Sequence, residues 1–260
     1  MARDKKHMSL FAFTATMVFF YAPLLVLVLF SFNASKTMTW SGFSLRWYNE
    51  LFFGSRDLWR ALGNSAIIAL TSASVSALLG TLAAIGMYWY NFRLKKYVEI
   101  SSFLPLIIPE IIIGVSLLIM FGVVGMPLGL GTIFIAHTTF CLPYAMLIVS
   151  SRLDEFDYSI VEAAYDLGAT EPQALLRVIV PVSMPGIIAA FLVSITLSLE
   201  DFVITFFVAG PGSSTLPLHI YSMIRFGVSP VINALSVMLM AASVVLAFST
   251  RGLVKYVAKG

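Results

Sequence analysis

Residues 157–187 read DYSIVEAAYDLGATEPQALLRVIVPVSMPGI and lie between two long apolar runs of the chain. Ser159 and Glu162 have the spacing of a capping box, which predicts the start of a short helix. Gly168 is placed to end that helix in a left-handed backbone conformation. Thr170 has the same capping-box spacing to a glutamine, so a second short helix is expected to begin there. The segment 157–180 therefore predicts a helix, a tight turn and a second helix.

The first of these short helices carries a small apolar face. Ala163, Ala164 and Leu167 form this face at helical spacing, and Glu162 and Asp166 flank it. A helix this short is marginally stable in isolation and needs a surface to pack against. We therefore expect the segment to dock on a partner, with a solvated linker as the alternative.

The composition of the chain is that of a membrane protein. It is 260 residues long, with 59% hydrophobic and 11% charged residues, against about 25% charged in a typical soluble domain. Two prolines, Pro181 and Pro185, are expected to end the second short helix before the fifth apolar run. Six apolar runs are long enough to cross a bilayer as helices: 9–32, 61–90, 98–122, 130–151, 186–208 and 231–250. We expect one all-α membrane domain over 1–260.

The distribution of basic residues predicts the orientation in the bilayer. With the N-terminus inside, most of the 16 Lys and Arg residues fall in inner segments. The outer segments hold only Lys36, Arg46, Arg56, Arg60 and Arg225. Because basic residues concentrate on the cytoplasmic side, both termini are expected to be cytoplasmic. A net charge of +3 is explained by this topology and gives no reason to expect nucleic acid as a partner.

Other chemistries are poorly represented in the sequence. The single cysteine, Cys141, excludes an internal disulfide, and His7, His137 and His219 lack metal-ligand spacing. No G-x-x-x-x-G-K-[ST] run is present to hold ATP phosphates. No Ser–His–Asp pattern is evident either, so we expect no enzymatic activity, no metal and no cofactor in this chain.

The run EAAYDLGATEPQALLRVIVPVSMPGI (162–187) resembles the EAA signature of bacterial ABC-importer permease subunits. Further stretches over nearly the whole chain are similar to the permeases of spermidine/putrescine importers. They are FSFNASK (30–36), RWYNEL (46–51), HTTFCLPY (137–144), SLEDFVITFFVAGP (198–211), LPLHIYSM (216–223) and GVSPVINAL (227–235).

The resemblance implies a type I ABC-importer permease fold in the bacterial inner membrane. Its implied partners are a second homologous permease subunit, two copies of a cytoplasmic ATPase and an extracytoplasmic polyamine-binding protein. In that family the EAA segment sits in a cleft of the ATPase. The residues expected to carry this coupling are Glu162, Ala163, Ala164, Asp166, Leu167 and Gly168.

Three acidic residues lie at bilayer depth inside expected spans: Glu110, Glu200 and Asp201. An ionisable group at membrane depth usually has a function. At about 1.5 Å per residue, Glu110 lies about 18 Å into its span and Glu200 about 21 Å into its own. These similar depths predict that carboxylates from two helices converge on one cavity. No Lys or Arg lies inside those spans, so a bound cation or protonation is expected to neutralise the acids.

The neighbours of these acids refine the expectation. Pro109 lacks the N–H of a helical hydrogen bond, which predicts a kink just before Glu110. Adjacent helical residues point about 100° apart, so Glu200 and Asp201 cannot face the same way. We expect one to contact a substrate and the other to face a partner subunit or a polar residue such as Ser198. The alternative is a pair of acids hydrogen-bonded across a helix interface.

The resemblance also implies that the acidic positions line the path of a polyamine, a flexible chain with charged ends and an apolar middle. Aromatic walls could bind such a cation, although core or lipid contact is the alternative; the candidates are Phe140, Phe202, Phe206 and Phe207. Trp47 in RWYNEL matches a family position associated with uptake. Interfacial anchoring is the alternative for this tryptophan.

Two other functions remain open on the sequence alone. A proton-coupled secondary transporter would use Glu110, Glu200 or Asp201 as proton carriers, although no convincing inverted repeat accompanies the spans. An ABC permease for another small cationic solute would keep the architecture and change the cargo. The polyamine importer permease is the favoured function.

Overall fold

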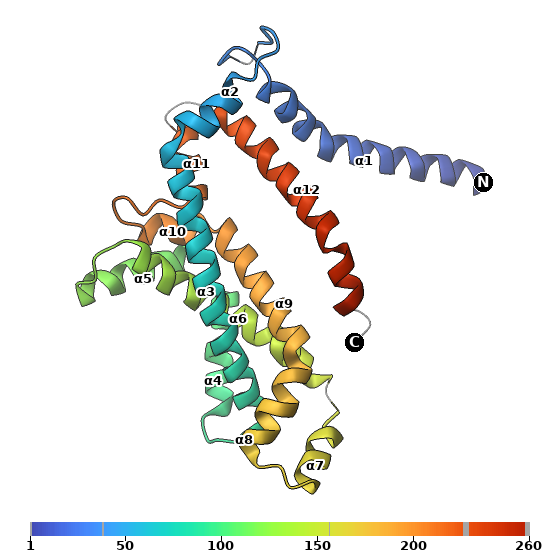
Figure 1. Ribbon diagram of the computed structural model, residues 1–260, viewed down its shortest axis with the longest axis vertical. Helices are drawn as coiled ribbons and strands as arrows, with labels where there is room; N and C mark the ends of the chain where they lie inside the picture. Colours follow the sequence, from blue (N-terminus) through green and yellow to red (C-terminus); the bar gives the residue numbers. More distant parts are fainter. Residues whose placement is uncertain (1, 38, 156, 226–228, 258–260) are drawn as a thin grey trace. The chain divides into compact units, whose positions relative to one another are not determined.

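The computed structural model describes residues 2–37, 39–155, 157–225 and 229–257, and its regular elements over these residues are all helical (Figure 1). The chain forms two compact units, one of residues 1–57 with 220–260 and one of residues 58–219. Each unit has its own packed helices and is described separately below.

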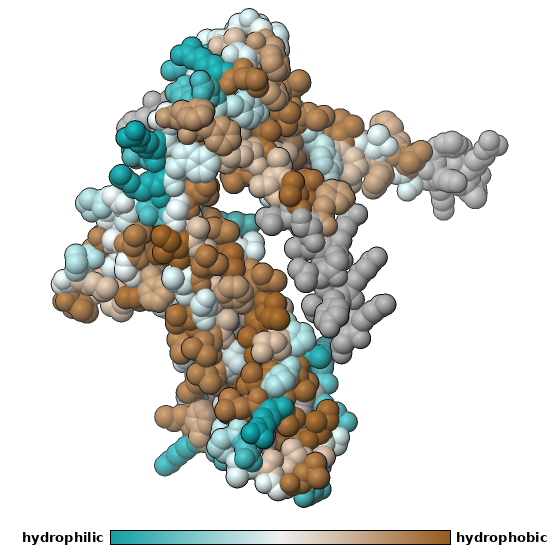
Figure 2. Space-filling view, in the orientation of Figure 1, coloured by the Kyte–Doolittle hydropathy of each residue, from teal (hydrophilic) through white to brown (hydrophobic). Residues whose placement is uncertain are grey.

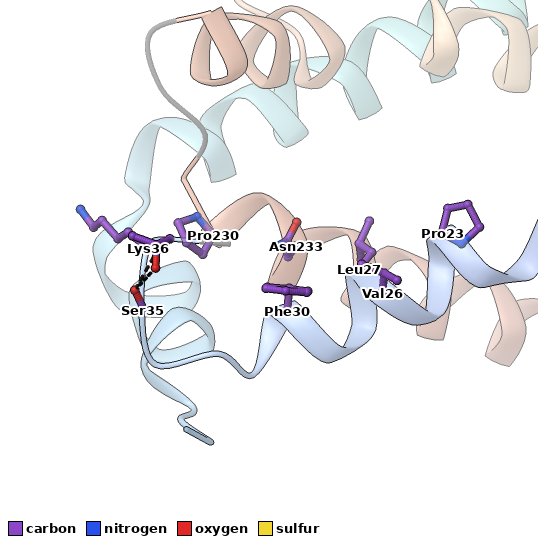
Figure 3. A pocket seen from close by; sticks show the side chains of 9 residues that line it. Pro23, Val26, Leu27, Phe30, Ser35, Lys36, Pro230 and Asn233 are labelled. Atoms are coloured by element: carbon purple, nitrogen blue, oxygen red, sulfur yellow. Dashed lines mark hydrogen bonds between the residues drawn. The ribbon is translucent and has the colours of Figure 1, made fainter. Parts of the chain in front are cut away.

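The first unit is built on two long helices, α1 (Ala2–Ser31) and α12 (Val231–Val257). These two helices pack against each other, and the short helix α2 (Arg46–Asn49) and the π-helical turn η1 (Glu50–Gly54) pack on α12. A cavity of about 270 Å³ lies in this unit, mostly among apolar side chains (Figure 3). Its lining residues are Pro23, Val26, Leu27, Phe30, Ser35, Lys36, Thr37, Pro230 and Asn233. None of the expected site residues lines it.

The loop between α1 and α2 is organised by Asn33, which is buried. Its amide group donates to the carbonyls of Thr37 and Thr39, and its Oδ1 accepts from the backbone and hydroxyl of Ser41. The backbone carbonyl of Asn33 accepts a 2.6 Å hydrogen bond from Nε1 of Trp47. These bonds satisfy both the side chain and the carbonyl of Asn33, so the loop has a specific fold.

The second unit contains most of the remaining helices. In chain order they are α3 (Arg56–Trp89), α4 (Lys95–Phe103), η2 (Leu104–Leu106), α5 (Glu110–Val124), α6 (Leu130–Asp154), α7 (Ser159–Asp166), α8 (Glu171–Ala174), η3 (Leu175–Ile179), α9 (Val180–Glu200), α10 (Val203–Val208) and α11 (Leu216–Arg225). The helices α3 and α11 each include residues of both units.

Small residues allow close packing of α3 against α6. Ser72, Ser76, Gly80 and Ala84 recur at every fourth position of α3 and are all buried. A Cβ added to Gly80 would lie 2.8 Å from the backbone nitrogen of Met146. Such small residues let the backbones of membrane helices approach each other closely.

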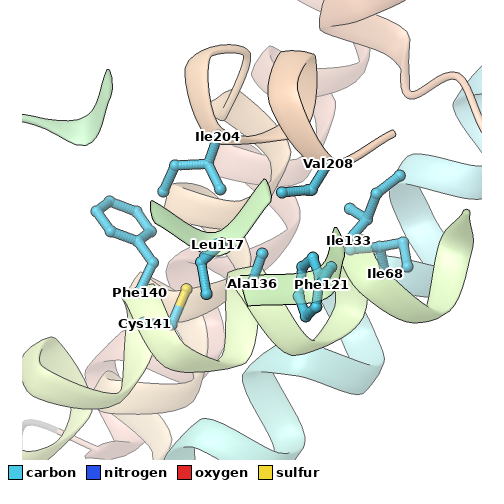
Figure 4. Packing of buried hydrophobic residues seen from close by; sticks show 9 residues of the cluster. All are labelled: Ile68, Leu117, Phe121, Ile133, Ala136, Phe140, Cys141, Ile204 and Val208. Carbon is cyan, nitrogen blue, oxygen red and sulfur yellow. The ribbon is translucent and has the colours of Figure 1, made fainter. Parts of the chain in front are cut away.

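One apolar cluster joins four helices of the second unit (Figure 4). It contains Ile68 of α3, Leu117 and Phe121 of α5, and six residues of α6 and α10: Ile133, Ala136, Phe140, Cys141, Ile204 and Val208. Figure 2 shows hydrophobic side chains along much of this unit's surface. Exposed leucines and isoleucines such as Leu78 and Ile119 contribute to it. An apolar surface of this extent suits contact with lipid or with another membrane protein.

Four helices in the described part of the chain are long and apolar enough to cross a membrane. They are Met8–Ser31, Arg56–Trp89, Leu130–Asp154 and Glu171–Glu200. The sixth expected span falls in α12, where the apolar stretch Val231–Val245 is shorter. The count of six spans is therefore not confirmed.

The third expected span, 98–122, is interrupted rather than kinked. Lys95–Leu106 and Glu110–Val124 would pass together as one span, but they are bent by 108° at the break. Pro109 has an extended backbone (φ −54°, ψ 134°) at the N-cap of α5. Because proline lacks an N–H and its ring disfavours a helical residue before it, the break falls here.

The expectation that Pro181 and Pro185 end a helix is wrong. The chain is continuously helical from Glu171 to Glu200, and both prolines lie inside it. The turn before Pro181 is the π-helix η3. Its wider hydrogen-bonding pattern shifts the preceding carbonyls that a proline ring would meet in a regular α-helix.

The local signals in the inner segment have mixed outcomes. The Thr170 capping box is confirmed, since the Thr170 N–H donates to Oε1 of Gln173 at 2.9 Å. Gly168 has the expected left-handed backbone, with φ +84°. The Ser159 capping box is wrong, because Ser159 is the first helical residue and its N–H donates to Oδ1 of Asp157.

Candidate functional site

The adjacent acids Glu200 and Asp201 lie at a break in the helix. Glu200 is the last residue of α9, Asp201 has an extended backbone (φ −63°, ψ 124°), and α10 begins at Val203. The expected continuous span over 186–208 is therefore wrong at this point. The two acids face different surroundings because the backbone changes direction between them, in addition to their helical offset.

Asp201 caps the first turn of α10. Its Oδ1 accepts the backbone N–H of Ile204 at 3.2 Å, and its Oδ2 accepts the backbone N–H of Thr205 at 2.8 Å. The hydroxyl of Thr205 also donates to Oδ2, at 2.7 Å. Aspartate is a preferred capping residue because its carboxylate satisfies N–H groups that have no partner inside the helix. This accounts for the break and for the orientation of Asp201.

His137 of α6 completes this arrangement. Its Nε2 lies 3.1 Å from Oδ2 of Asp201 and 2.9 Å from the Thr205 hydroxyl, and its Nδ1 lies 2.7 Å from the Ser198 hydroxyl. His137 is 1% exposed and Asp201 is 7% exposed. Because an ionised carboxylate only accepts, Nε2 is assigned as the donor to Asp201. The hydroxyl of Ser198 also contacts Ser72 of α3 at 3.3 Å.

This polar network supplies partners for Asp201 that the sequence did not predict. The acids were expected to be neutralised by a bound cation or a proton, since no Lys or Arg lies in the spans. Asp201 instead has four donors from the protein, including the imidazole of His137. Ser198, expected as a neighbour of one acid, lies in the same network and reaches Asp201 through His137.

Glu200 has a different environment. Its side chain is exposed, and no hydrogen bond or ion pair is found for it within the described residues. Aromatic rings follow it closely: Phe202 and Phe206 have centroids 5.7 Å apart, and Phe206 and Phe207 have centroids 5.4 Å apart. Glu200 is thus the member of the pair that remains accessible to a ligand.

Glu110 is the first residue of α5 and is also exposed. One turn later, a Cβ added to Gly114 would lie 2.8 Å from Phe207 and 3.4 Å from Cα of Ile204 in α10. After α5, the Leu128 carbonyl approaches Gly210, which follows α10. The order of these contacts means that α5 and α10 run in the same direction. Glu110 therefore lies at the end of this helix pair where α10 begins.

Trp47 belongs to the first unit, whereas the three acids and Ser198 belong to the second. Its indole is 0% exposed, and its N–H is used by the Asn33 carbonyl. Arg46 lies over the ring, 5.2 Å from its centroid. In this structure Trp47 is a packed component of the loop, with no free face for a ligand.

The inner segment presents an exposed stripe. Ile160 and Ala163 of α7 and Leu167, the C-cap residue directly after it, are spaced at helical intervals and are all exposed, Leu167 to 89%. Val161 lies on the opposite face and is buried in a second apolar cluster with Leu153 and other residues. The remaining expected residues are also accessible: Glu162, Asp166 and Gly168 are exposed and Ala164 is half-buried.

Aromatic and polar contacts fix this segment to the C-terminal end of α3. The rings of Trp89 and Tyr158 have centroids 6.4 Å apart, and the Tyr90 hydroxyl donates a hydrogen bond to Glu171. At the start of α7, the Ser159 N–H holds the pKa of Asp157 below its ordinary value. Thus the segment is held against the second unit while its stripe remains uncovered.

Sequence reasoning missed His137. The histidine was noted only for its lack of metal-ligand spacing, and its partners are distant in sequence. Its depth was an available signal: His137 lies seven residues after the start of the expected span 130–151, and Asp201 seven residues before the end of 186–208. Both positions are about 10 Å from the outer ends of their spans.

Comparison with known proteins agrees with this architecture. Residues 76–260 match the family described as "Binding-protein-dependent transport system inner membrane component". The spermidine/putrescine transport system permease protein PotC of Escherichia coli (strain K12) is 39% identical, over 95% of this chain and 94% of that protein. The putrescine transport system permease protein PotI of the same strain is 44% identical, over 88% of this chain and 84% of that protein.

A solved structure shows the same fold. It is titled "Crystal structure of a bacterial ABC transporter involved in the import of the acidic polysaccharide alginate". It superposes on this chain with a TM-score of 0.76, covering 97% of this chain and 96% of that chain at 14% sequence identity. The expected all-α ABC-importer permease fold is confirmed by this likeness.

The apolar helices, the polar groups buried among them and this fold define a multi-pass membrane transport protein. The chain belongs to the family of inner-membrane components of binding-protein-dependent transport systems.

Proposed function

We propose that this chain is a permease subunit of an ATP-driven importer that carries polyamines such as spermidine or putrescine into the cytoplasm. The relatives that match most of its length are named as permeases for these compounds. The observation that carries the proposal is the pair of exposed carboxylates, Glu110 and Glu200, at the same end of the packed helices α5 and α10. A solute with separated ammonium groups is complementary to two such carboxylates.

In this proposal Glu110 and Glu200 contact the ammonium groups directly. Neither has a partner among the described residues, so a cationic ligand would supply the missing charge. Asp201 and Ser198 act behind them, because their polar atoms are already bonded within the protein. Phe206, six residues after Glu200 and about half exposed, offers an aromatic face for the apolar or cationic parts of the ligand. Trp47 supports the outer loop.

The stripe Ile160, Ala163 and Leu167 is the proposed contact with a cytoplasmic ATPase. An exposed apolar face on an otherwise polar segment is typical of a surface that binds a partner. The complete importer would contain a second homologous permease, two ATPase copies and an extracytoplasmic binding protein. Both termini would be cytoplasmic, since basic residues concentrate in the segments on that side.

Uptake of labelled spermidine by the complete importer in proteoliposomes tests the substrate site. Glu110→Gln and Glu200→Gln should each reduce uptake at least about tenfold, because each removes a charged partner of an ammonium group. Glu155→Gln makes the same change at the exposed inner end of α6, and should transport normally. Wild-type uptake in both site variants would refute the substrate site.

The same preparation distinguishes the alternatives. Competition by unlabelled putrescine but not by unrelated cations supports a polyamine site over a site for another small cation. The buried His137–Asp201 pair is also an arrangement that a proton-coupled transporter could use. Uptake that resists vanadate but collapses with an uncoupler would establish that alternative in place of the ATP-driven importer.

A further inference from the structure

We propose that His137 is a positioning residue for transport: it holds both sides of the break between α9 and α10 and so fixes the direction in which Glu200 is presented. The inference rests on the proposed function, in which Glu200 contacts the cationic substrate. His137 itself is buried and has no contact with the substrate in this proposal.

The two nitrogens of one imidazole reach the two helices on either side of the break. Nδ1 contacts Ser198, in the last turn of α9, at 2.7 Å. Nε2 contacts Asp201 at 3.1 Å and Thr205, in α10, at 2.9 Å. The histidine comes from a third helix, α6, so the break is tied to a part of the bundle outside α9 and α10.

Glu200 lies between the two anchored positions. Ser198 is two residues before it and Asp201 is the next residue. The side chains of Ser198 and Asp201 are buried and bonded, whereas that of Glu200 is exposed. The backbone at Glu200 is therefore fixed from both sides, while its carboxylate stays accessible.

The break needs such an anchor because α10 is only six residues long. A helix of that length is unstable without tertiary contacts. Removing the donor at Nε2 would also leave a buried carboxylate with fewer hydrogen bonds, which is unfavourable in a poorly hydrated interior. We expect Asp201 to turn toward other donors in that case, and the direction of Glu200 to change with it.

Amide variants separate the two contacts of the imidazole. The side-chain amide of glutamine can reach the position of Nε2, whereas that of asparagine reaches only the position of Nδ1. His137→Gln should preserve the contact with Asp201 and retain most transport. His137→Asn should raise the apparent KM for spermidine at least about tenfold, the effect expected on losing a hydrogen bond to a charged group. Assembly and ATP-dependent conformational cycling should remain intact in both.

The experiment measures spermidine uptake over a range of concentrations in the reconstituted importer, with subunit stoichiometry and ATPase rate recorded for each variant. Thr139→Val is the matched control, since Thr139 is exposed on the same helix and its hydroxyl bonds only the Ile135 carbonyl. Equal kinetics for His137→Gln and His137→Asn, or losses of assembly without a change in KM, would overturn the positioning role.

A double variant separates this inference from the proposed function. If His137 acts through Glu200, adding His137→Asn to Glu200→Gln should reduce transport no further. An additional loss, with assembly intact, would overturn the inference and leave the substrate site in place. Wild-type uptake by Glu200→Gln alone would instead refute the proposed substrate site itself.

Discussion

The hydroxyl of Tyr90 donates a hydrogen bond to the carboxylate of Glu171, which joins the C-terminal end of α3 to the first residue of α8. Both side chains are exposed, so this contact contributes little to folding in a polar environment. The position of this hydrogen bond matters more than its strength. It holds the start of α8, and α8 directly follows α7 and the turn after it, where the exposed stripe lies.

Tyr90→Phe should leave assembly unchanged and weaken the link between ATP hydrolysis and transport. The variant removes only the hydroxyl, so packing of the ring is retained. We expect fewer solute molecules transported per ATP hydrolysed, measured as the ratio of uptake to phosphate release. Tyr97→Phe, which removes a hydroxyl from the exposed surface of α4, serves as the control. A ratio equal to that of the wild type would show that the bond is dispensable for coupling.

Trp47→Phe should destabilise the outer loop without changing the KM for substrate. Phenylalanine keeps part of the packing but leaves the buried Asn33 carbonyl without its indole donor. An unsatisfied buried acceptor costs about 1–3 kcal/mol. A lowered midpoint of thermal unfolding with unchanged KM is the expected result. If KM rises while stability is unchanged, Trp47 contacts the substrate instead.

Two glycines of α3 should respond differently to alanine. A Cβ at Gly80 would lie 2.8 Å from both Cβ of Ala145 and the backbone nitrogen of Met146, whereas one at Gly86 has nothing within 4 Å. Gly80→Ala should destabilise the protein by about 1–3 kcal/mol, because α3 and α6 must separate. Gly86→Ala should be tolerated. The yield and thermal stability of the purified complex measure both effects, and equal behaviour would contradict this packing.

Substitutions of Gly168 should follow the requirements of its left-handed backbone. Asparagine tolerates this conformation, whereas a β-branched side chain is strongly disfavoured in it. Gly168→Val should therefore cost about 1–2 kcal/mol locally and reduce ATPase binding. Gly168→Asn should retain most of the ATPase binding. Co-purification of the ATPase with each variant is the measurement, and identical retention by both would show that the turn geometry is unimportant.

Asp157 should stabilise α7 at pH values above the ordinary pKa of an aspartate side chain. The Ser159 N–H lowers the pKa of Asp157 in the folded chain, so the ionised form is favoured by folding. This contribution is present above the ordinary value of 3.8 and is lost as pH falls through the lowered folded value. Asp157→Ala should therefore speed hydrogen exchange in α7 at pH 7 relative to the wild type. A difference that persists unchanged once Asp157 is protonated at acidic pH would contradict this origin.

Part of the local chemistry was readable in the sequence where both partners lie within a few residues, although the expected capping box at Ser159 was wrong. Thr170 and Gln173 form their capping box, and Gly168 adopts the left-handed turn, as expected. The long apolar runs also predict where most helices lie. These features follow from short-range sterics and hydrogen bonding, which depend little on the rest of the fold.

Features that depend on tertiary neighbours were not readable in the same way. The helix stop expected at Pro181 is absent because the preceding turn adopts a π-helical geometry. The buried surroundings of Asp201 include His137, which lies more than 60 residues away in the sequence. A periodic pattern in one segment gives no information about a hydrogen-bond donor on another helix. Only the similar depths of His137 and Asp201 in their expected spans connect these two residues.

The continuity of the helix from Glu171 to Glu200 has a mechanical consequence. Its 30 residues make a rod about 45 Å long. One end adjoins the segment proposed to bind the ATPase, and the other end carries an exposed carboxylate. Because the helix continues from one end to the other, we expect a tilt at its N-terminal end to move Glu200 at its C-terminal end as well. The extended backbone of Asp201 then ends this helix, and the π-helical turn η3 lies near its other end.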